Sequence, residues 1–77
     1  LVLGRSSTLC DRVVDDSTVS RRHAKFFIAD GALMIEDMGS AYGTKVNGKP
    51  VVADQAERID AGDRLQIGGV KFEIARA

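Results

Sequence analysis

Turn-forming residues recur along this chain, and they constrain its fold more than any other feature of the sequence. Glycine stands at positions 4, 31, 39, 43, 48, 62, 68 and 69, and the one proline stands at position 50. The short segments between turn signals suit strands and leave little room for helices. We therefore expect an all-β chain, in which many short strands joined by tight turns form a sandwich or a barrel.

Three dipeptides predict tight hairpin turns. Asp30-Gly31 and Asn47-Gly48 are signals for type I′ turns, because these residues tolerate the positive φ that both central positions of that turn require. Gly68-Gly69 predicts a third turn. Apolar and polar residues alternate beside these turns, which is typical of strands with one face on a core.

Alternation and turn signals together locate the strands. The expected strands cover residues 1–3, 13–14, 23–29, 33–37, 44–46, 51–52, 64–67 and 70–75. Within residues 23–29, the period of two places Ala24, Phe26 and Ile28 toward the core. Residues 53–58 have the length of one helical turn, but they lack the i, i+3, i+4 apolar spacing of a helix.

Length and composition exclude several classes of protein. The 77 residues are expected to form a single domain, 1–77, since one core typically uses about 50–200 residues. The 11 basic and 11 acidic residues give zero net charge, which argues against a general nucleic-acid binder but leaves a local basic patch open. No apolar run is long enough to insert into a membrane. The single Cys10 excludes an internal disulfide and favours a reducing, cytoplasmic setting.

The sequence offers little to catalysis. The one histidine, His23, lies three residues after Ser20, a spacing that rarely places a hydroxyl on an imidazole, so a structural role is the better interpretation. Adjacent acids such as Glu36 and Asp37 usually cap backbone N–H groups or face water. No metal-ligand spacing and no nucleotide-binding glycine loop occurs. We therefore predict no enzyme, no bound metal and no cofactor.

The basic residues are more informative. Arg5 follows the first apolar run, and Ser20, Arg21 and Arg22 belong to a segment with the character of a loop. One interpretation is a solvated basic turn. The other is an anion site, because guanidinium groups and a hydroxyl bind phosphate through charge-assisted hydrogen bonds. Arg5, Ser20 and Arg21 form such a site only if the two loops are neighbours, which spacing alone does not establish.

Four motifs, taken in order, carry a resemblance to a known family. They are Gly4-Arg5, Val19-Ser20-Arg21-Arg22-His23-Ala24, the run from Asp37 to Thr44 followed by Val46-Asn47-Gly48, and the run from Gly62 to Gly68. Along nearly its whole length the chain resembles a forkhead-associated (FHA) domain. The resemblance implies an eleven-stranded β-sandwich of short, mostly antiparallel strands that binds phosphothreonine peptides through loops at one end.

The same resemblance implies roles for individual residues. Arg5 and Ser20 correspond to the residues that hold the phosphate, and Arg21 to a position that adds a phosphate contact. His23 corresponds to a histidine that braces the binding loop, in agreement with its structural interpretation. The positions implied to shape the loops and hairpins are Gly4, His23, Ser40, Gly43, Thr44 and Asn47.

Two neighbouring residues depart from the family pattern. Tyr42 replaces an asparagine that hydrogen-bonds the peptide main chain, and Ala41 stands where Thr or Ser is common. Together with Arg22, they are the residues that we expect beside the peptide. Loss of one hydrogen bond costs about 1–1.5 kcal/mol, or about tenfold in affinity. Tyr42 either offsets this loss by packing on the peptide or donating its phenol, or fills the site and favours binding without phosphate.

Two functions follow from these observations. The first is a phosphothreonine-dependent protein-binding module in Ser/Thr kinase signalling. The second is an FHA-fold assembly module that binds its partner independently of phosphorylation. The family usually carries a strand or two before the Gly-Arg strand, so we expect those strands to be lacking here and a free sheet edge to permit self-association. We expect the chain to be the core of an FHA domain from a larger bacterial protein.

Overall fold

Short strands make up the regular structure of this chain. The structure is a computed structural model and describes residues 1–75. The strands are β1 (Val2–Gly4), β2 (Arg12–Val13), β3 (Ala24–Ala29), β4 (Ala32–Asp37), β5 (Thr44–Val46), β6 (Lys49–Pro50), β7 (Glu57–Arg58), β8 (Arg64–Ile67) and β9 (Val70–Glu73). The described residues form no helix, and hence none that is long and apolar enough to cross a membrane.

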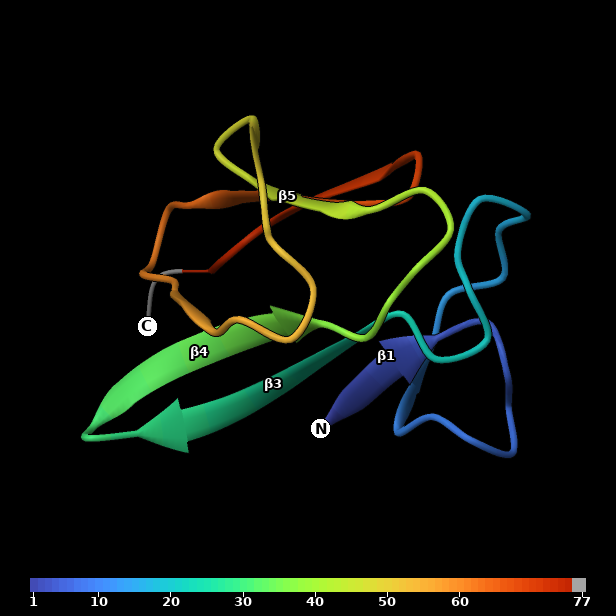
Figure 1. Cartoon of the computed structure of the whole chain (residues 1–77), viewed down its shortest axis with the longest axis horizontal. Coiled ribbons are helices and arrows are strands. Elements are labelled where there is room, and N and C mark those ends of the chain that lie inside the picture. The colour runs from blue at the N-terminus through green and yellow to red at the C-terminus, as the bar shows by residue number, and fades with distance from the viewer. Residues whose placement is uncertain (76–77) are drawn as a thin grey trace.

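The strands form two sheets that face each other across a core (Figure 1). Sheet A has the strand order β2-β1-β3-β4-β7, and sheet B has the order β6-β5-β8-β9. Among the described strands, β1 and β2 pair in parallel and the remaining neighbours pair antiparallel. The prediction of an all-β sandwich of mostly antiparallel strands is thus confirmed. Residues 1–75 form nine strands, where the family pattern implies eleven.

The three predicted hairpin turns are all present. Asp30 and Gly31 have φ angles of 50° and 75°, and Asn47 and Gly48 have φ angles of 50° and 83°, as type I′ turns require. The Gly68-Gly69 turn joins β8 to β9, with Gly68 at a φ of 59°. Because each turn has two residues, it fixes the register of the strands that it joins.

Buried aliphatic side chains from both sheets and from two connecting segments form the core. They are Leu3, Val19, Ala24, Ile35, Ile59, Leu65 and Ile67, and each is at most 9% exposed. The expected position of Ile28 in this core is wrong, because its side chain is 68% exposed. The β3–β4 hairpin extends past the part of sheet A that sheet B covers, and Ile28 lies near its tip (Figure 1).

One strand prediction is wrong, and one strand was not predicted. The return strand expected at residues 51–52 is β6 instead, because the two-residue turn places Lys49 directly opposite Val46. Residues 57–58, within the segment considered for a helical turn, form β7 against β4. Ile59 follows β7, is 2% exposed, and donates its backbone N–H to Leu33 O at 2.9 Å. Burial of Ile59 therefore holds this otherwise polar segment against sheet A.

One end of the sandwich gathers the loops that carry the predicted site residues. Strands β1 and β4 end there, and strands β3 and β5 begin there (Figure 1). The segments 5–11, 14–23 and 38–43 consequently lie at the same end. Sheet B supports the middle segment, because the backbone N–H of Gly69 donates to Thr18 Oγ1 at 2.7 Å.

This support predicts unequal effects of alanine at two turn glycines. Gly31 has a positive φ of 75° and open space where a Cβ would lie, so Gly31→Ala should cost only the left-handed strain of about 1–2 kcal/mol. A Cβ on Gly68 would lie 2.3 Å from the backbone oxygen of Thr18, so Gly68→Ala should cost at least about 1 kcal/mol more. Urea denaturation of both variants measures the difference in stability. Equal denaturation midpoints would contradict the close contact between the Gly68 turn and Thr18.

Candidate functional site

Arg5 leaves β1 at the loop end of the sandwich and is fixed at two points. Its backbone N–H donates to Ser20 O at 2.9 Å, and its side-chain Nε donates to Val19 O at 3.0 Å. The two bonds join the loop after β1 to the loop before β3. The Nε bond holds the guanidinium in place, and within residues 1–75 no acceptor takes the N–H donors of its two terminal nitrogens.

Ser20 is held by bonds that leave its hydroxyl proton unused. Its backbone N–H donates to His23 Nδ1 at 3.0 Å, and its Oγ accepts the backbone N–H of Ala41 at 3.0 Å. Within residues 1–75, the Ser20 hydroxyl has no acceptor for its own proton. Ser20 therefore presents an oriented O–H donor close to the segment on which Arg5 is anchored.

His23 links the two loops from a fully buried position. Its side chain has 0% exposure, and its Nδ1 accepts from Ser20 N. With Nδ1 as an acceptor, a ring proton is assigned to Nε2, which donates to Gly43 O at 2.8 Å. Both ring nitrogens are occupied by backbone groups, so the imidazole acts as a structural bracket and offers no free nitrogen for acid–base chemistry.

Asp37 organises the loop that follows β4. Its carboxylate, which is 4% exposed, accepts the backbone N–H groups of Gly39 and Ser40, each at 3.0 Å. It also accepts the hydroxyls of Ser40 at 2.7 Å and Thr44 at 2.6 Å. The Ser40 hydroxyl in turn accepts the backbone N–H of Gly43 at 2.9 Å. One carboxylate thus closes the whole turn from residue 39 to residue 44.

These bonds determine the charge state of Asp37. Burial raises the pKa of the carboxyl, but hydrogen bonds from Ser40 and Thr44, together with His23 nearby, outweigh burial and hold the pKa below its ordinary value. The distance between Asp37 Oδ1 and His23 Nε2 is 3.9 Å. The sequence analysis did not include Asp37 among the site residues. It treated Asp37 and Glu36 only as two adjacent acids. The spacing Asp-x-x-Ser was the available signal, since such side chains commonly bond backbone groups in turns.

The backbone of Arg21 is closely packed. Its carbonyl oxygen accepts the backbone N–H of Ser6 at 3.2 Å and the thiol of Cys10 at 2.8 Å. A Cβ on Gly4 would lie 2.3 Å from the same oxygen, so only glycine fits at the end of β1. The Gly-Arg pair of the sequence therefore has a steric cause: Gly4 permits the close approach and Arg5 follows it into the site.

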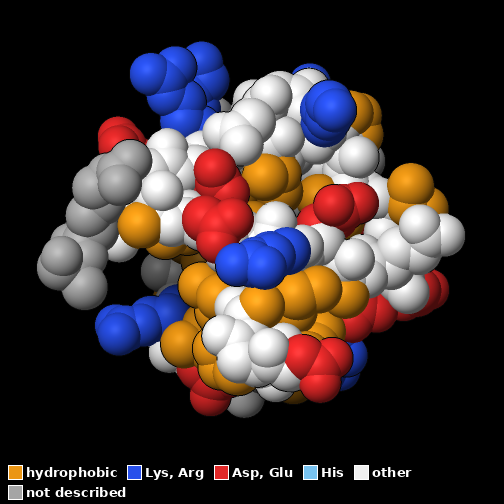
Figure 2. Space-filling view, turned by 90° about the vertical axis from the view of Figure 1, so that its left-hand side faces the viewer, with side chains coloured by type: hydrophobic (Ala, Val, Ile, Leu, Met, Phe, Trp, Pro, Cys, Tyr) orange, Lys and Arg blue, Asp and Glu red, His pale blue; other side chains and the backbone are white. Residues whose placement is uncertain are grey.

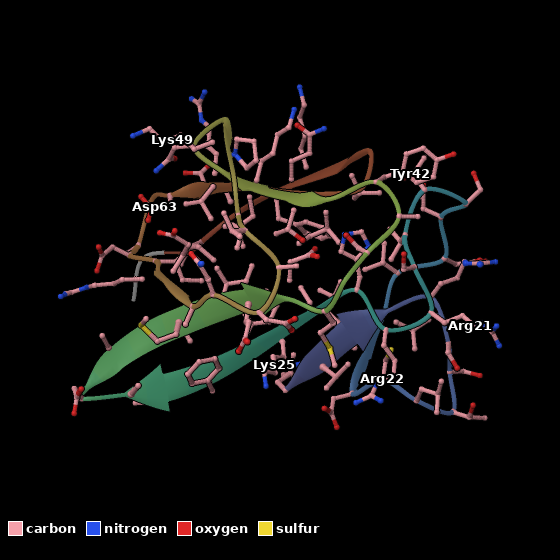
Figure 3. The ribbon with its side chains drawn as sticks, viewed as in Figure 1. Arg21, Arg22, Lys25, Tyr42, Lys49 and Asp63 are labelled. Atoms are coloured by element: carbon pink, nitrogen blue, oxygen red, sulfur yellow. The ribbon has the colours of Figure 1, made fainter. Side chains whose placement is uncertain are left out.

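The side chains expected around a ligand lie at the molecular surface. Arg21 is exposed and extends outward at the loop end of the sandwich, and Tyr42 is 68% exposed at the same end (Figure 3). Ala41, beside Tyr42, is exposed and gives its backbone N–H to Ser20 Oγ. Arg22 lies on the other side, beneath sheet A and away from Tyr42 (Figure 3). The structure thus brings Arg5, Ser20, Ala41 and Tyr42 to adjoining loops and separates Arg22 from Tyr42.

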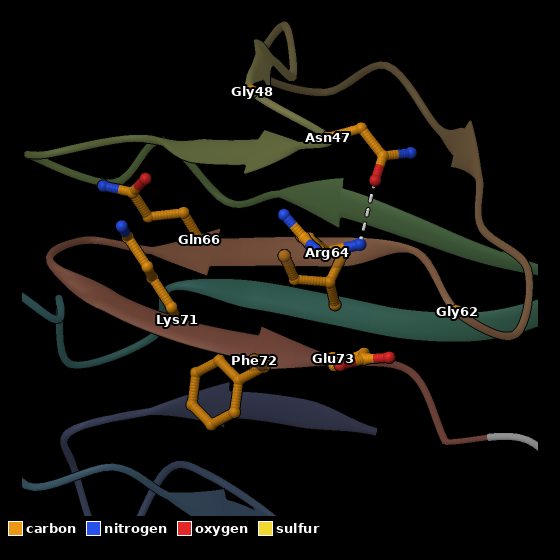
Figure 4. Close-up of a pocket in the computed structure, with 9 residues that line it drawn as sticks. Asn47, Gly48, Gly62, Arg64, Gln66, Lys71, Phe72 and Glu73 are labelled. Atoms are coloured by element: carbon orange, nitrogen blue, oxygen red, sulfur yellow. Dashed lines mark hydrogen bonds between the residues drawn. The ribbon is translucent and has the colours of Figure 1, made fainter.

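A hollow of about 820 Å³ lies away from these loops, over the outer face of sheet B (Figure 4). Arg64, Gln66 and Lys71 contribute to its lining, and Asn47 closes one end by accepting the Arg64 backbone N–H at 2.9 Å. Asn47 is therefore a hairpin residue rather than part of the loop site.

The described residues contain no cluster of metal-ligating side chains. A single phosphate needs no deep cavity, since exposed donors on fixed loops are sufficient to bind it.

Figure 2 shows the end of the sandwich opposite the loops. Acidic, basic and apolar side chains all lie on this face. Basic and acidic groups are interspersed there, with no continuous basic surface. This face therefore offers no continuous basic patch to a polyanion.

Comparison with known proteins identifies relatives of this chain. Residues 1–68 match the family described as FHA domain. The chain is similar to the oxoglutarate dehydrogenase inhibitor of Corynebacterium diphtheriae, with 47% identity over 64 residues, 83% of this chain and 41% of that protein. The chain therefore spans about two fifths of the length of this curated relative.

Solved structures give the same result for the fold. The FHA domain of the CT664 protein from Chlamydia trachomatis superposes with a TM-score of 0.89 at 28% identity, covering 99% of this chain and 74% of that chain. An FHA domain analysed for phosphothreonine-dependent interactions superposes with a TM-score of 0.85 at 26% identity, covering 99% and 75%.

The lowered pKa of Asp37 predicts a pH dependence of stability. The ionised carboxylate stabilises the fold fully above the ordinary aspartate pKa of about 3.9, and this contribution is lost as the pH falls through the lowered pKa of the folded state. Asp37→Asn should reduce the free energy of unfolding at pH 7 by about 2–3 kcal/mol. In urea denaturation, the gap between the wild type and this variant should narrow as the pH falls from 5 to 3, and a constant gap would contradict this role.

Proposed function

Because this chain belongs to the FHA domain family, we propose that it is a non-catalytic module that binds a phosphothreonine-containing peptide at the loop end of the sandwich. One observation carries the proposal. The guanidinium of Arg5 is anchored on Val19 O, next to Ser20, whose hydroxyl proton has no acceptor among the described residues. Two oriented donors on adjoining, braced loops suit an anion that is small and tetrahedral.

In the proposed complex, the terminal nitrogens of Arg5 and the hydroxyl of Ser20 bind phosphate oxygens, and Arg21 adds a further cationic contact. Hydrogen bonds to charged groups contribute about 1.5–3 kcal/mol each, so two or three of them make binding depend on the phosphate. Zero net charge of the chain is compatible with this function, since the donors act at short range on one phosphate.

Peptide selectivity is proposed to come from Ala41, Tyr42 and Arg22. Tyr42 exposes 68% of its surface beside the Ser20–Ala41 link, where its ring provides a flat apolar wall and its phenol a donor for the peptide main chain. Arg22 projects in a different direction, so we expect only an outlying contact from it. The exposed Tyr42 in place of the asparagine also supports the second candidate, a module that binds its partner without phosphate.

The setting of this module is likewise a proposal. We infer a cytoplasmic regulator in bacterial Ser/Thr kinase signalling, in which residues 1–77 are the FHA core of a longer protein, because a relative named as an enzyme inhibitor is longer than the matched segment. The partner is then a phosphorylated protein, and neither nucleic acid nor membrane insertion is part of the function. Self-association through a sheet edge is the additional interaction that we propose.

The phosphate site predicts a ranked series of affinities. In titrations of a phosphothreonine peptide, Arg5→Ala and Ser20→Ala should each weaken binding at least about tenfold, because each removes a charge-assisted hydrogen bond. Lys49→Ala removes a positive charge at an exposed position far from the loops and serves as the matched control. Equal affinity for the phosphorylated and unphosphorylated peptide would refute the proposal and favour the phosphate-independent module.

Replacing Tyr42 distinguishes the two candidate functions. Tyr42→Asn restores the hydrogen-bonding side chain of the family and should strengthen phosphopeptide binding by up to about tenfold if Tyr42 merely lacks that bond. Tyr42→Ala should then weaken binding, since the ring surface is lost without a replacement donor. If both variants bind the unphosphorylated partner much more weakly than the wild type does, the tyrosine is a phosphate-independent contact.

A further inference from the structure

The outer face of sheet B carries an excess of positive charge. Thr44, Leu65 and Ile67 are buried in the core. Phe72 packs against the same core. Because the side chains of a strand alternate between the two faces of a sheet, the residues between these positions face outward. On β5, β8 and β9 the outward residues are Lys45, Arg64, Gln66, Lys71 and Glu73. This face thus has three cations and one carboxylate.

The strand register makes the three cations neighbours around Gln66. Gln66 lies directly opposite Lys45 on β5 and Lys71 on β9. Arg64 lies two residues before Gln66 on the same strand, so it is the diagonal neighbour of both lysines, at a typical spacing of about 7–8 Å. Figure 4 shows Arg64, Gln66 and Lys71 on the adjoining strands β8 and β9. We call Lys45, Arg64 and Lys71 together the basic face.

The basic residues of the two sheets differ in their partners. On sheet A, Lys25 forms an ion pair with Glu36 at 3.5 Å, and Arg58 forms one with Asp60 at 3.3 Å. Within residues 1–75, the three exposed cations of the basic face form no ion pair. Their mutual repulsion is therefore not offset inside the chain, and a partner that supplies carboxylates there gains attraction from all three.

We propose that the basic face docks an acidic segment of a partner protein, with carboxylates over Lys45, Arg64 and Lys71. In an extended segment, alternate side chains point to the same side about 6.4–6.8 Å apart, close to the diagonal spacing of the cations. At the centre of the face, Gln66 Nε2 donates to Gly68 O at 3.1 Å. Gln66 Oε1 is then an acceptor for a backbone N–H of the docked segment.

The composition of the face favours a protein segment over a nucleic acid or a membrane. Glu73, opposite Arg64, repels a continuous row of phosphates, whereas a peptide avoids this repulsion with one neutral or basic residue. The outward residues of β5, β8 and β9 include no aromatic ring on which a base stacks, since Phe72 belongs to the inner face. They also include no apolar side chain that inserts into a lipid surface.

The basic face is distinct from the candidate phosphate site and from the edges of the sheet. Arg5 and Ser20 belong to the loops at one end of the sandwich, whereas the basic face lies on the flat outer side of sheet B. Backbone pairing at an edge lies within the plane of the sheet, so an added strand does not use these side chains. The proposal therefore adds a second binding surface and does not rest on recognition of phosphothreonine.

An NMR titration of the chain with a peptide of alternating glutamate and serine tests the proposal. The backbone amides of Lys45, Gln66 and Lys71 should shift, with a dissociation constant of about millimolar at low salt. Binding should weaken between about 0.01 M and 0.15 M salt, since the Debye length falls from about 30 Å to about 8 Å. A peptide with glutamine in place of glutamate is the matched control and should cause no shifts. Absence of shifts with the glutamate peptide overturns the proposal.

Substitutions on the face predict effects in both directions. Replacing Lys45, Arg64 and Lys71 together with glutamine should weaken binding of the glutamate peptide about tenfold or more. Glu73→Gln removes the one repulsive group and should strengthen binding by up to about fivefold. All four side chains are exposed, so neither variant disturbs the core. The affinity for a phosphothreonine peptide should stay unchanged in the triple variant, which separates this proposal from the proposed function.

A matched triple variant on sheet A controls for net charge. Replacing Arg12, Lys25 and Arg58 with glutamine removes the same charge from the chain and should leave binding of the glutamate peptide unchanged. An equal loss in both triple variants overturns the proposal, because net charge then attracts the peptide. Shifts confined to the loops around Arg5 also overturn it, since the phosphate site is then the binding site. Tighter binding of an oligouridine or of phosphatidylserine vesicles to the basic face overturns the assignment of a protein partner.

Discussion

A fully buried imidazole with both nitrogens hydrogen-bonded is the interaction on which the candidate site depends. His23 accepts from Ser20 N on one side and donates to Gly43 O on the other, so it fixes the distance between the loop before β3 and the loop after β4. The carboxylate of Asp37 holds the loop after β4 in shape by accepting hydrogen bonds from Ser40 and Thr44. In a domain this small, such polar links give loops the rigidity that a large core would otherwise supply.

The hydrogen bonds of His23 and Asp37 also position the donors of Ser20 and Arg5 that a ligand could use. Ser20 Oγ accepts from Ala41 N because the two loops are held together, and its own O–H has no acceptor among residues 1–75. Arg5 is anchored on Val19 O by the same local arrangement. A neutral chain therefore places two positioned donors at one end of the sandwich, an arrangement that suits a single phosphate better than a polyanion.

Local signals predicted much of the fold, and their failures have physical causes. The turns at Asp30-Gly31 and Asn47-Gly48 were predictable because positive φ is a property of the residues themselves. Strand β7 was missed because Glu57 and Arg58 are polar, and burial of the following Ile59 places them on sheet A. Alternation predicts which side of a sheet a residue faces, but it does not reveal whether another layer covers it, and Ile28 is exposed for that reason.

The sequence by itself determined the all-β class, the three hairpins, and the residue types of the candidate anion site, because periodicity and turn chemistry act over a few neighbouring residues. Only the tertiary structure decided that Arg5, Ser20 and Ala41 belong to adjoining loops, that Arg22 projects elsewhere, and that Asp37 is a buried organiser. These facts depend on contacts between residues far apart in the chain, which the order of residues specifies only through the packing of the whole sandwich.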